Sequence, residues 1–345
     1  MKEKLWNKIG AAVLAVIMMV SFGAAAPTMA ADHEHVYVDG LCTECGKYEA
    51  AFITRIPIKD KYTKAIEETG TLETITYQTP FYGIDESIEV EKVLQVYLPY
   101  GYDPAQQYNV MYLMHGGGES EYYWLNDEAV YENTKAMGKT TKAVIDNMVA
   151  EGKMEPTIFV ASTYETKDKN GNRLTEGDMS GYAQEFRNII VPLVESTYST
   201  YCAGDVSEEN LIATRDHRGF AGFSMGSRCT VDGILMHDLD LVAWYGAYSG
   251  PDASLGGGGG VSAEDVKAVM ESFGPEMDIK YIYNGDGTAD FALEGHQTFA
   301  YGLLEVMPES FQDGRNWCWV CFKGGSHAYN CWIVDLYNSM LVFFK

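Results

Sequence analysis

The sequence is poor in positive charge. Its 345 residues include 25 Lys and Arg against 49 Asp and Glu, which gives a formal net charge of -24. Nucleic acids and anionic membrane surfaces repel so acidic a chain. The shortage of positive charge therefore argues against both as partners. The acidity is compatible with neutral or cationic partners, or it serves only to keep the protein soluble.

Cysteine is also scarce, and the seven residues form an odd set. In an exported protein an odd number leaves at least one thiol unpaired. Cys318 and Cys321 lie in an apolar run typical of a buried strand, where residues three apart point to opposite faces, so we do not expect a bridge between them. Cys229 follows a predicted turn and is expected on a helix. Buried free thiols are the default expectation.

A long apolar run occurs at the N-terminus. The apolar run extends from Ile9 to about Ala26 and is preceded by Lys2, Lys4 and Lys8. After it, Thr28-Met-Ala30 provides small residues for cleavage before Ala31. This pattern predicts that residues 1–30 are a secretory signal peptide, so the protein is secreted or held at the bacterial cell surface. The alternative is an uncleaved anchor, because the run approaches the length needed to span a membrane.

Residues 31–52 contain a group of possible metal ligands. His33, His35, Cys42 and Cys45 could form a tetrahedral zinc set. Their spacing is shorter than in the well-known finger patterns, so a Cys42–Cys45 disulfide or a pair of free thiols is the alternative. In either case we expect an N-terminal appendage outside the main fold.

Residues 53–345 are long enough for one large domain with a sizeable core. Apolar strand patterns alternate with helical ones, which predicts a three-layer α/β sandwich with a mainly parallel central sheet. The first two strands are expected to form an antiparallel hairpin at one edge. The expected strands are 74–78, 89–98, 109–115, 157–162, 218–223, 241–248, 279–283 and 316–322, and the expected helices are 139–151, 184–198, 263–273, 294–307 and 330–343.

One stretch in this domain organises the rest. Gly222-Phe-Ser224-Met225-Gly226 has the Gly-x-Ser-x-Gly pattern of a sharp turn between a strand and a helix. Such a turn lifts a serine hydroxyl clear of the backbone, where a base can activate it. The two glycines avoid clashes in the turn. The Met225 N–H, at the start of the helix, would stabilise an oxyanion.

The serine needs a base, and His327 is the best candidate. It lies in the polar loop 323–328 between the last strand and the last helix, at the carboxyl edge of the sheet. His115, before a glycine turn, is expected to support that turn. His237 and His296 are expected at the surface.

A carboxylate must orient the imidazole, and two follow the strand 279–283. We favour Asp290 over Asp286, and the order Ser224, Asp290, His327 is that of α/β-hydrolases. The second oxyanion donor is expected from the turn Gly116–Gly118, with the Gly117 N–H as the best candidate.

Taken together, these motifs resemble the feruloyl esterase and esterase D-like branch of the α/β-hydrolases, within carbohydrate esterase family one. The resemblance covers roughly residues 85–345. Its landmarks are Tyr112-Leu-Met-His-Gly-Gly-Gly with Trp124, Asn147-Met-Val-Ala-Glu-Gly-Lys, Ile190-Val-Pro-Leu-Val-Glu-Ser-Thr-Tyr198, His217-Arg-Gly-Phe-Ala-Gly-Phe-Ser-Met-Gly, Gly287-Thr-Ala-Asp290 and Gly324-Gly-Ser-His327-x-x-x-x-Trp332.

The resemblance implies a serine carboxylesterase that hydrolyses hydroxycinnamoyl esters on plant cell-wall polysaccharide such as arabinoxylan, without metal or organic cofactor. It also supports Asp290 as the acid of the triad. The chain departs from the family at Ser326-His327-Ala328, where Gly-His-Asp is common, and at Ser227, where glycine is common. Both differences bear on the substrate more than on catalysis.

Aromatic residues near these loops could bind substrate. Tyr122, Tyr123, Trp124 and Trp332 could form a slot for a phenolic ring or stack on a sugar, and wall packing is the alternative for each. The alternative functions are an acetyl-xylan or other small-acyl carbohydrate esterase, an acyltransferase with the same triad, and a non-catalytic carbohydrate-binding protein.

Overall fold

The computed structural model describes residues 37–38, 41–42, 56–126, 135–166, 179–251 and 260–345. It divides into two units, Met1–Ala50 and Ala51–Lys345. In the first unit, β1 (Tyr37–Val38) pairs antiparallel with β2 (Leu41–Cys42). His33, His35, Cys45 and the signal segment lie outside the described residues, so the predictions made for them stay predictions.

The second unit is built on an eight-stranded sheet in the order β10-β9-β8-β7-β5-β6-β4-β3. The strands from β10 to β6 pair in parallel, whereas β4 pairs antiparallel with β6 and with β3. The expected edge hairpin is thus confirmed. The strands are β3 (Thr71–Phe81), β4 (Asp85–Leu98), β5 (Asn109–Met114), β6 (Thr157–Ser162), β7 (Arg218–Phe223), β8 (Trp244–Tyr248), β9 (Tyr281–Gly287) and β10 (Trp317–Phe322).

Burial explains the difference between the central and the edge strands. Every residue of β5, β6, β7 and β8 is buried, because helices cover both faces of the sheet there, and their sequences are accordingly mostly apolar. β3, at the edge, mixes exposed and buried positions. The core therefore lies on both sides of the parallel strands.

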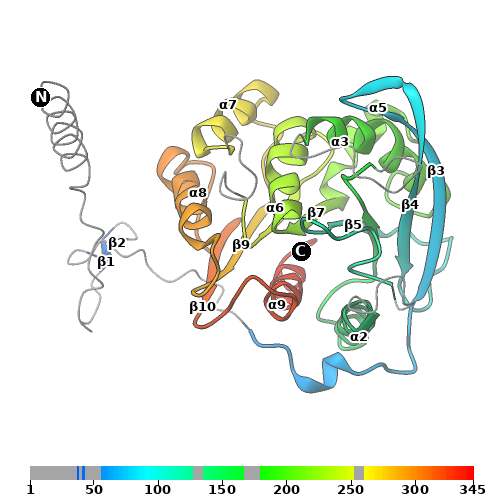
Figure 1. The fold of residues 1–345 in the computed structure, drawn as a ribbon, viewed down its shortest axis with the longest axis horizontal. Helices are drawn as coiled ribbons and strands as arrows, with labels where there is room; N and C mark the ends of the chain where they lie inside the picture. The colour runs from blue at the N-terminus through cyan, green and yellow to red at the C-terminus, as the bar shows by residue number, and fades with distance from the viewer. Residues whose placement is uncertain (1–36, 39–40, 43–55, 127–134, 167–178, 252–259) are drawn as a thin grey trace, which may run out of the picture. The chain divides into compact units, whose positions relative to one another are not determined.

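Helices cover the two faces of the sheet, as Figure 1 shows. α2 (Lys135–Ala150) and α9 (Tyr329–Met340) lie on one face and contact each other. The other face carries α3 (Ser180–Glu185), α6 (Met225–Arg228) and α8 (Leu293–Val306). The three-layer α/β sandwich is therefore confirmed. The remaining helices are α4 (Val191–Thr197), α5 (Glu208–Ala213) and α7 (Ala263–Phe273). None of the described helices is long and apolar enough to cross a membrane.

The helix expected over 184–198 differs from the prediction. It begins earlier, at Ser180, and a π-helical segment, Phe186–Ile190, separates α3 from α4. Pro192 near the start of α4 explains the interruption, because proline lacks the N–H that a continuous α-helix would bond. α5 was not predicted, since it is short and polar.

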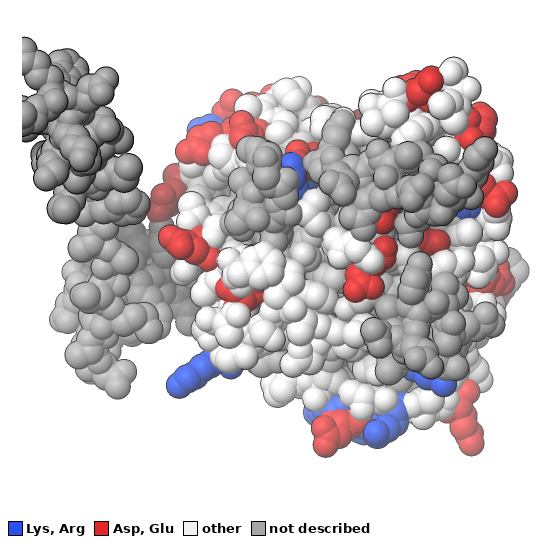
Figure 2. Space-filling view, viewed as in Figure 1, with Lys and Arg blue, Asp and Glu red and all other residues white. Residues whose placement is uncertain are grey.

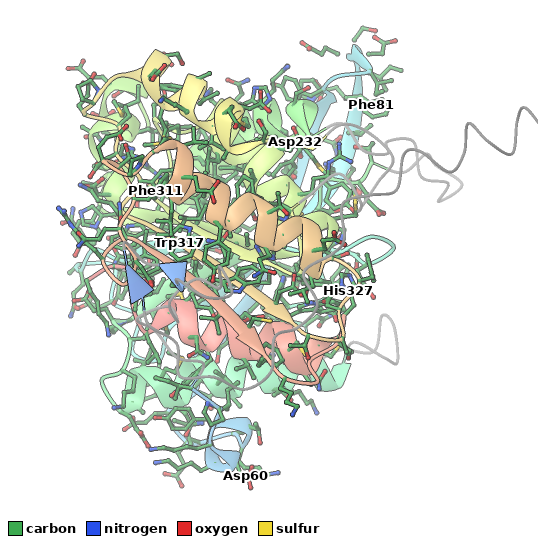
Figure 3. All side chains as sticks on the ribbon, turned by 90° about the vertical axis from the view of Figure 1, so that its left-hand side faces the viewer. Asp60, Phe81, Asp232, Phe311, Trp317 and His327 are labelled. Carbon is green, nitrogen blue, oxygen red and sulfur yellow. The ribbon has the colours of Figure 1, made fainter. Side chains whose placement is uncertain are left out.

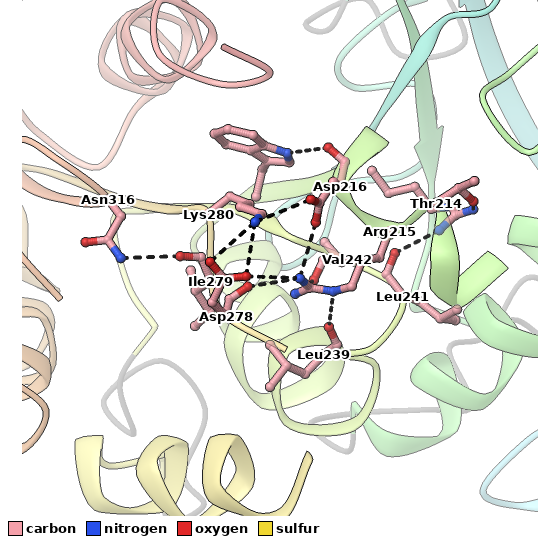
Figure 4. A network of polar contacts seen from close by, with 12 residues as sticks. Thr214, Arg215, Asp216, Leu239, Leu241, Val242, Asp278, Ile279, Lys280 and Asn316 are labelled. Carbon is pink, nitrogen blue, oxygen red and sulfur yellow. Dashed lines mark hydrogen bonds and ion pairs between the residues drawn. The ribbon is translucent and has the colours of Figure 1, made fainter. Parts of the chain in front are cut away.

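The strand expected over 241–248 begins only at Trp244. Arg215 donates to the Leu239 and Val242 carbonyls at 3.0 and 2.9 Å, and Arg218 donates to the Leu241 carbonyl at 3.2 Å. The Leu241 and Val242 carbonyls therefore bond to arginine side chains and not to a neighbouring strand. The network in Figure 4, which includes the Arg215 contacts, lies at the amino ends of the parallel strands.

Candidate active site

Ser224 occupies a strained turn between β7 and α6. Its backbone has φ 55° and ψ -124°, a conformation that residues with a side chain rarely adopt outside functional turns. The Ser224 N–H donates to the Tyr248 carbonyl of the neighbouring strand at 2.9 Å. The strand–turn–helix predicted from the Gly-x-Ser-x-Gly pattern is therefore present.

The glycines of this turn have no room for a side chain. A Cβ on Gly222 would lie 2.4 Å from the Gly226 carbonyl oxygen. A Cβ on Gly226 would lie 2.6 Å from the Met114 carbonyl oxygen at the end of β5. Such distances are far inside van der Waals contact, so the turn depends on glycine at both positions.

The glycine turn after β5 lies directly against Ser224. A Cβ on Gly116 would be 3.3 Å from the Ser224 Cβ, and a Cβ on Gly117 would be 3.3 Å from the Met225 Cγ. Met225 is the first residue of α6, so its N–H is among those without an acceptor inside the helix. The two predicted oxyanion donors, Gly117 and Met225, thus come from neighbouring turns.

His115 holds the glycine turn, as expected. Its Nδ1 lies 2.7 Å from the Gly116 carbonyl oxygen and its Nε2 lies 2.7 Å from the Thr163 Oγ1. A carbonyl oxygen can only accept, so the proton is on Nδ1. Because a trans peptide is planar, fixing the Gly116 carbonyl also fixes the opposite direction of the Gly117 N–H.

His327 and Asp290 are brought together by the loops after β10 and β9. His327 Nδ1 lies 2.8 Å from Asp290 Oδ1, and the Asp290 side chain is fully buried while His327 is partly exposed. His327 and Trp317, the first residue of β10, lie near opposite ends of the sheet in Figure 3. The imidazole is thus at the carboxyl edge, where ligands of parallel sheets bind.

The Asp290 carboxylate is held in its ionised form. Burial acts to raise the pKa of Asp290, but hydrogen bonding from His327, from the Ala292 N–H and from the Ser249 hydroxyl outweighs it, so the pKa lies below its ordinary value. The Ala292 N–H donates at 2.9 Å. An ionised carboxylate at this place can fix the imidazole tautomer with the proton on Nδ1.

Asp286 forms a second, separate pair. It lies within β9, and its Oδ2 is 3.0 Å from Nδ1 of His296, with both side chains fully buried. The expectation that His296 is a surface residue was wrong, because α8 turns it inward to Asp286 and edge-on to Trp319. His237 is exposed, as expected. The structure therefore brings Asp290, and not Asp286, to His327.

Trp332 connects the serine turn to the imidazole. Its ring stacks on Phe223, next to Ser224, at 3.9 Å and 15°, and meets His327 edge-on at 5.2 Å. The Trp332 Nε1–H donates to the Ser249 hydroxyl at 2.8 Å. Sequence reasoning missed Ser249, although a polar residue directly after β8 was a usable signal.

In the part of the chain that the structure describes, no hydrogen bond joins Ser224 to His327. Catalytic hydrogen bonds are often long in ligand-free enzymes and tighten when substrate binds. The shared edge of the sheet and the Phe223–Trp332–His327 contacts bring both groups to one site.

The aromatic residues expected to bind substrate are buried. Tyr123, Trp124 and Trp332 are 2%, 1% and 7% exposed. Tyr123 packs on Phe223, and the Trp124 Nε1–H donates to the Met114 carbonyl at 3.0 Å. In this conformation they form the wall behind the site, and their contact with substrate stays a prediction.

Sequence reasoning also missed an exposed aromatic residue beside His327. Phe291 directly follows Asp290 and is 65% exposed. Its position next to the favoured acid was the available signal.

Among the described residues, no three His, Cys, Asp or Glu side chains form a group that could hold a metal ion. Cys202, Cys229, Cys318 and Cys331 are buried and form no disulfide, and Cys321, which also forms none, is exposed. The expectation that Cys318 and Cys321 do not bridge is confirmed. Cys229 lies in the π-helical segment Cys229–Leu235 that follows α6.

The face of the molecule that includes His327 is only sparsely charged. His327 lies at the right-hand side of Figure 3, which is the side that faces the viewer in Figure 2. That face shows scattered Asp and Glu, fewer Lys and Arg, and uncharged surface near its centre. Such a face suits a neutral ligand better than an anionic polymer.

Comparison with known proteins supports the assignment of this fold. A family model described as "Putative esterase" matches residues 86–231, which include Ser224 and the glycine turn. The feruloyl esterase module from Clostridium thermocellum, a serine-to-alanine mutant complexed with sinapinate, is 27% identical, with a TM-score of 0.68 over 87% of this chain and 96% of that one. A ferulic acid esterase from Anaeromyces mucronatus shares the fold, with 22% identity and a TM-score of 0.58 over 83% of this chain and 96% of the other.

Curated relatives are much longer than this chain. Endo-1,4-beta-xylanase Y of Acetivibrio thermocellus is 37% identical over 204 residues, 59% of this chain and 16% of that protein. An endo-1,4-beta-xylanase/feruloyl esterase of Xylanibacter ruminicola is 26% identical over 241 residues, 67% of this chain and 27% of that protein. The chain thus spans less than a third of either relative.

Proposed function

Because the chain is an α/β-hydrolase related to the feruloyl esterases of carbohydrate esterase family one, we propose that it is a serine carboxylesterase that cleaves hydroxycinnamoyl esters on plant cell-wall polysaccharide. The observation that carries the proposal is the strained Ser224 turn at the same sheet edge as the Asp290–His327 pair. The similar proteins include a feruloyl esterase module and xylanases, which supports the feruloyl acyl group and the xylan context.

In the proposed reaction, the Ser224 Oγ attacks the ester carbonyl while His327 Nε2 takes the hydroxyl proton. Asp290 keeps the proton on Nδ1 and stabilises the imidazolium. The Gly117 and Met225 N–H groups donate to the oxyanion, and each such donor contributes about 3 kcal/mol to transition-state stabilisation.

The tetrahedral intermediate then loses its alcohol. His327 returns the proton to the leaving oxygen, and the acyl group stays on Ser224. Water, activated by the same imidazole, attacks this acyl-enzyme and releases the carboxylic acid. No metal or organic cofactor enters these steps.

The proposed substrate also agrees with the proposed location. A signal peptide over residues 1–30 would export the protein to where plant polysaccharide such as arabinoxylan is found. The acidic surface would not hinder binding, because an esterified arabinoxylan is largely neutral. We propose no nucleic-acid partner and no stable membrane insertion once the signal is removed.

The test compares initial rates with methyl ferulate and an aryl acetate for the wild type and Ser224→Ala. We expect Ser224→Ala to lower kcat by about 10⁶-fold, as loss of the nucleophile does in other triad enzymes. Ser227→Ala is the matched control, because Ser227 is also buried near the turn and its hydroxyl has no hydrogen-bond partner among the described residues.

The outcomes separate the alternatives. Cleavage of the acetate alone would move the proposal to a small-acyl carbohydrate esterase. A product formed only with an added alcohol acceptor would indicate an acyltransferase. A folded wild type that neither cleaves an ester nor labels at Ser224 with a fluorophosphonate would contradict the mechanism and favour a binding protein.

A further inference from the structure

Phe291 is an exposed aromatic residue that packs on the proposed catalytic base. Its ring centroid lies 4.3 Å from that of His327, with 37° between the ring planes. Its side chain is 65% exposed, whereas Phe223 and Phe322, which also lie near the site, are 1% and 7% exposed. A single exposed apolar residue is ordinary. One that packs on a catalytic imidazole, however, also lies beside the part of the substrate that the imidazole contacts.

The backbone around Phe291 is tied to the rest of the site. The Thr288 N–H donates to the Phe322 carbonyl at 3.0 Å, and the Ala289 N–H donates to the Gly325 carbonyl at 2.8 Å. Across Phe291 in the chain, the Leu293 N–H donates to the Asp290 carbonyl at 3.4 Å. The loop that contains Asp290 is therefore hydrogen-bonded to the loop that contains His327. These backbone bonds hold the Phe291 ring in its exposed position.

The chemistry of the reaction says which half of an ester lies here. His327 must give its proton to the oxygen of the leaving alcohol, so that oxygen has to approach Nε2. The rest of the alcohol, beyond that oxygen, then extends past the imidazole. Phe291 lies next to the imidazole on this path. The acyl chain leaves the same tetrahedral carbon in another direction.

We propose that Phe291 forms the subsite for the alcohol half of the ester, where a sugar stacks its C–H face on the ring. The proposal rests on the esterase function above and deepens it. An exposed aromatic face suits a pyranose or furanose ring, which presents apolar C–H groups between its hydroxyls. A methyl alcohol is too small to cover the ring. Phe291 would thus determine specificity on the alcohol side, independently of the acyl group.

The experiment compares two ferulate esters that differ only in the alcohol, methyl ferulate and feruloyl arabinose. We expect Phe291→Ala to lower kcat/KM for the arabinose ester by about tenfold, the scale of one aromatic contact, and for methyl ferulate by less than about twofold. Phe291→Trp, which keeps an aromatic face, should retain the preference for the sugar ester. Ile84→Ala is the control, because Ile84 is 62% exposed and lies in the hairpin turn between β3 and β4.

Equal losses on both esters would overturn the proposal, because the ring would then act only by positioning His327. No loss on either ester would overturn it as well. Failure of the feruloyl proposal gives a different result, in which the wild type cleaves acetates but not ferulates. The same variants would then be compared on acetylated arabinose and ethyl acetate, where the alcohol-side effect is still expected. A folded wild type that cleaves no ester would overturn both proposals.

Discussion

At the scale of single residues, the site contains two Asp–His pairs of different kinds. Asp290 and His327 belong to loops, and the imidazole is partly exposed. Asp286 and His296 belong to β9 and α8, and both are fully buried. Only the first pair can meet a substrate. Sequence spacing left the choice between Asp286 and Asp290 open because both follow the same apolar run, and it is the length of β9, which extends to Gly287, that separates them.

Asparagine substitutions should separate the roles of the two pairs. We expect Asp290→Asn to lower kcat by about 10⁴-fold with little change in fold, because the amide cannot hold the imidazole in the required tautomer. Asp286→Asn should instead destabilise the protein by about 1–3 kcal/mol, since it weakens the partner of the buried His296. Rates with a saturating ester and urea unfolding measure the two effects. A larger loss of kcat in Asp286→Asn than in Asp290→Asn would contradict the assignment.

The contacts between other residues of the site could not be predicted from the sequence. Ser249, Trp332 and Phe223 lie far apart in the chain, and they meet because β7 and β8 are neighbours in the sheet and α9 packs on β8. The burial of Trp124 and Tyr123 has the same origin. Local motifs predicted Ser224 and His327, and the family resemblance supported Asp290, whereas contacts between non-sequential loops carry no such signal.

At the scale of elements, each parallel strand was predicted because it contains a buried apolar run. Boundaries failed where side chains or proline altered the backbone hydrogen bonds, as at Trp244 and before α4. The turn at Ser224 is the opposite case. Its conformation was predictable because only a few residue types tolerate it.

The glycines of the serine turn should tolerate no side chain. We expect Gly222→Ala to abolish soluble folded enzyme or to lower activity by orders of magnitude, because its Cβ would overlap the Gly226 carbonyl at 2.4 Å, a contact made of backbone on both sides. Gly302→Ala in α8 is the control, since its nearest contact is 3.1 Å to the Ala263 Cβ and alanine favours helix by about 1 kcal/mol. Thermal unfolding and ester hydrolysis test this pair. A stable, active Gly222→Ala would show that the turn is not as close-packed as described.

The strand that ends at the proposed nucleophile begins with a buried ion pair. Arg218, 1% exposed, binds Glu195 through Nε and through Nη2 at 3.2 Å, and it also binds the Leu241 carbonyl and Thr214. Arg218→Met should cost about 3–5 kcal/mol, because Glu195 would remain buried without its cation.

A surface pair at the same end of the sheet serves as the control. Lys280 lies near Asp278 and Asp216 with side chains 34–55% exposed, so Lys280→Met should cost less than about 1 kcal/mol. Urea unfolding of the two variants gives the comparison. Similar losses in both would mean that the Arg218–Glu195 pair contributes no more than a surface contact.

At the scale of the whole molecule, the many carboxylates make stability depend on pH, and buried ones can act in opposite directions. The pKa of Asp290 is lowered in the folded protein. The pKa of Asp146 is raised, chiefly by burial, although Tyr97 and the Gly70 N–H bond to it. The ordinary pKa of an unfolded aspartate is about 3.9. Net charge alone therefore does not predict the stability profile.

The sign of each contribution follows from proton uptake. For Asp290 the folded pKa is below the unfolded one, so its stabilisation is present above about pH 4 and is lost as pH falls through the folded pKa. For Asp146 the folded pKa is above the unfolded one. The folded state then keeps a proton that the unfolded state releases, so stability is lost as pH rises from about 4 through the folded pKa.

Urea unfolding of Asp290→Asn and Asp146→Asn across the acid and neutral range should show both effects. The stability of the wild type relative to Asp290→Asn should rise as pH increases toward about 4 and then level off, because only the wild type has a carboxylate bonded to His327. The stability of the wild type relative to Asp146→Asn should fall as pH increases above about 4. Each variant is the control for the other, since both replace a buried aspartate with its amide. Parallel pH profiles for the two differences would contradict the opposite environments of these carboxylates.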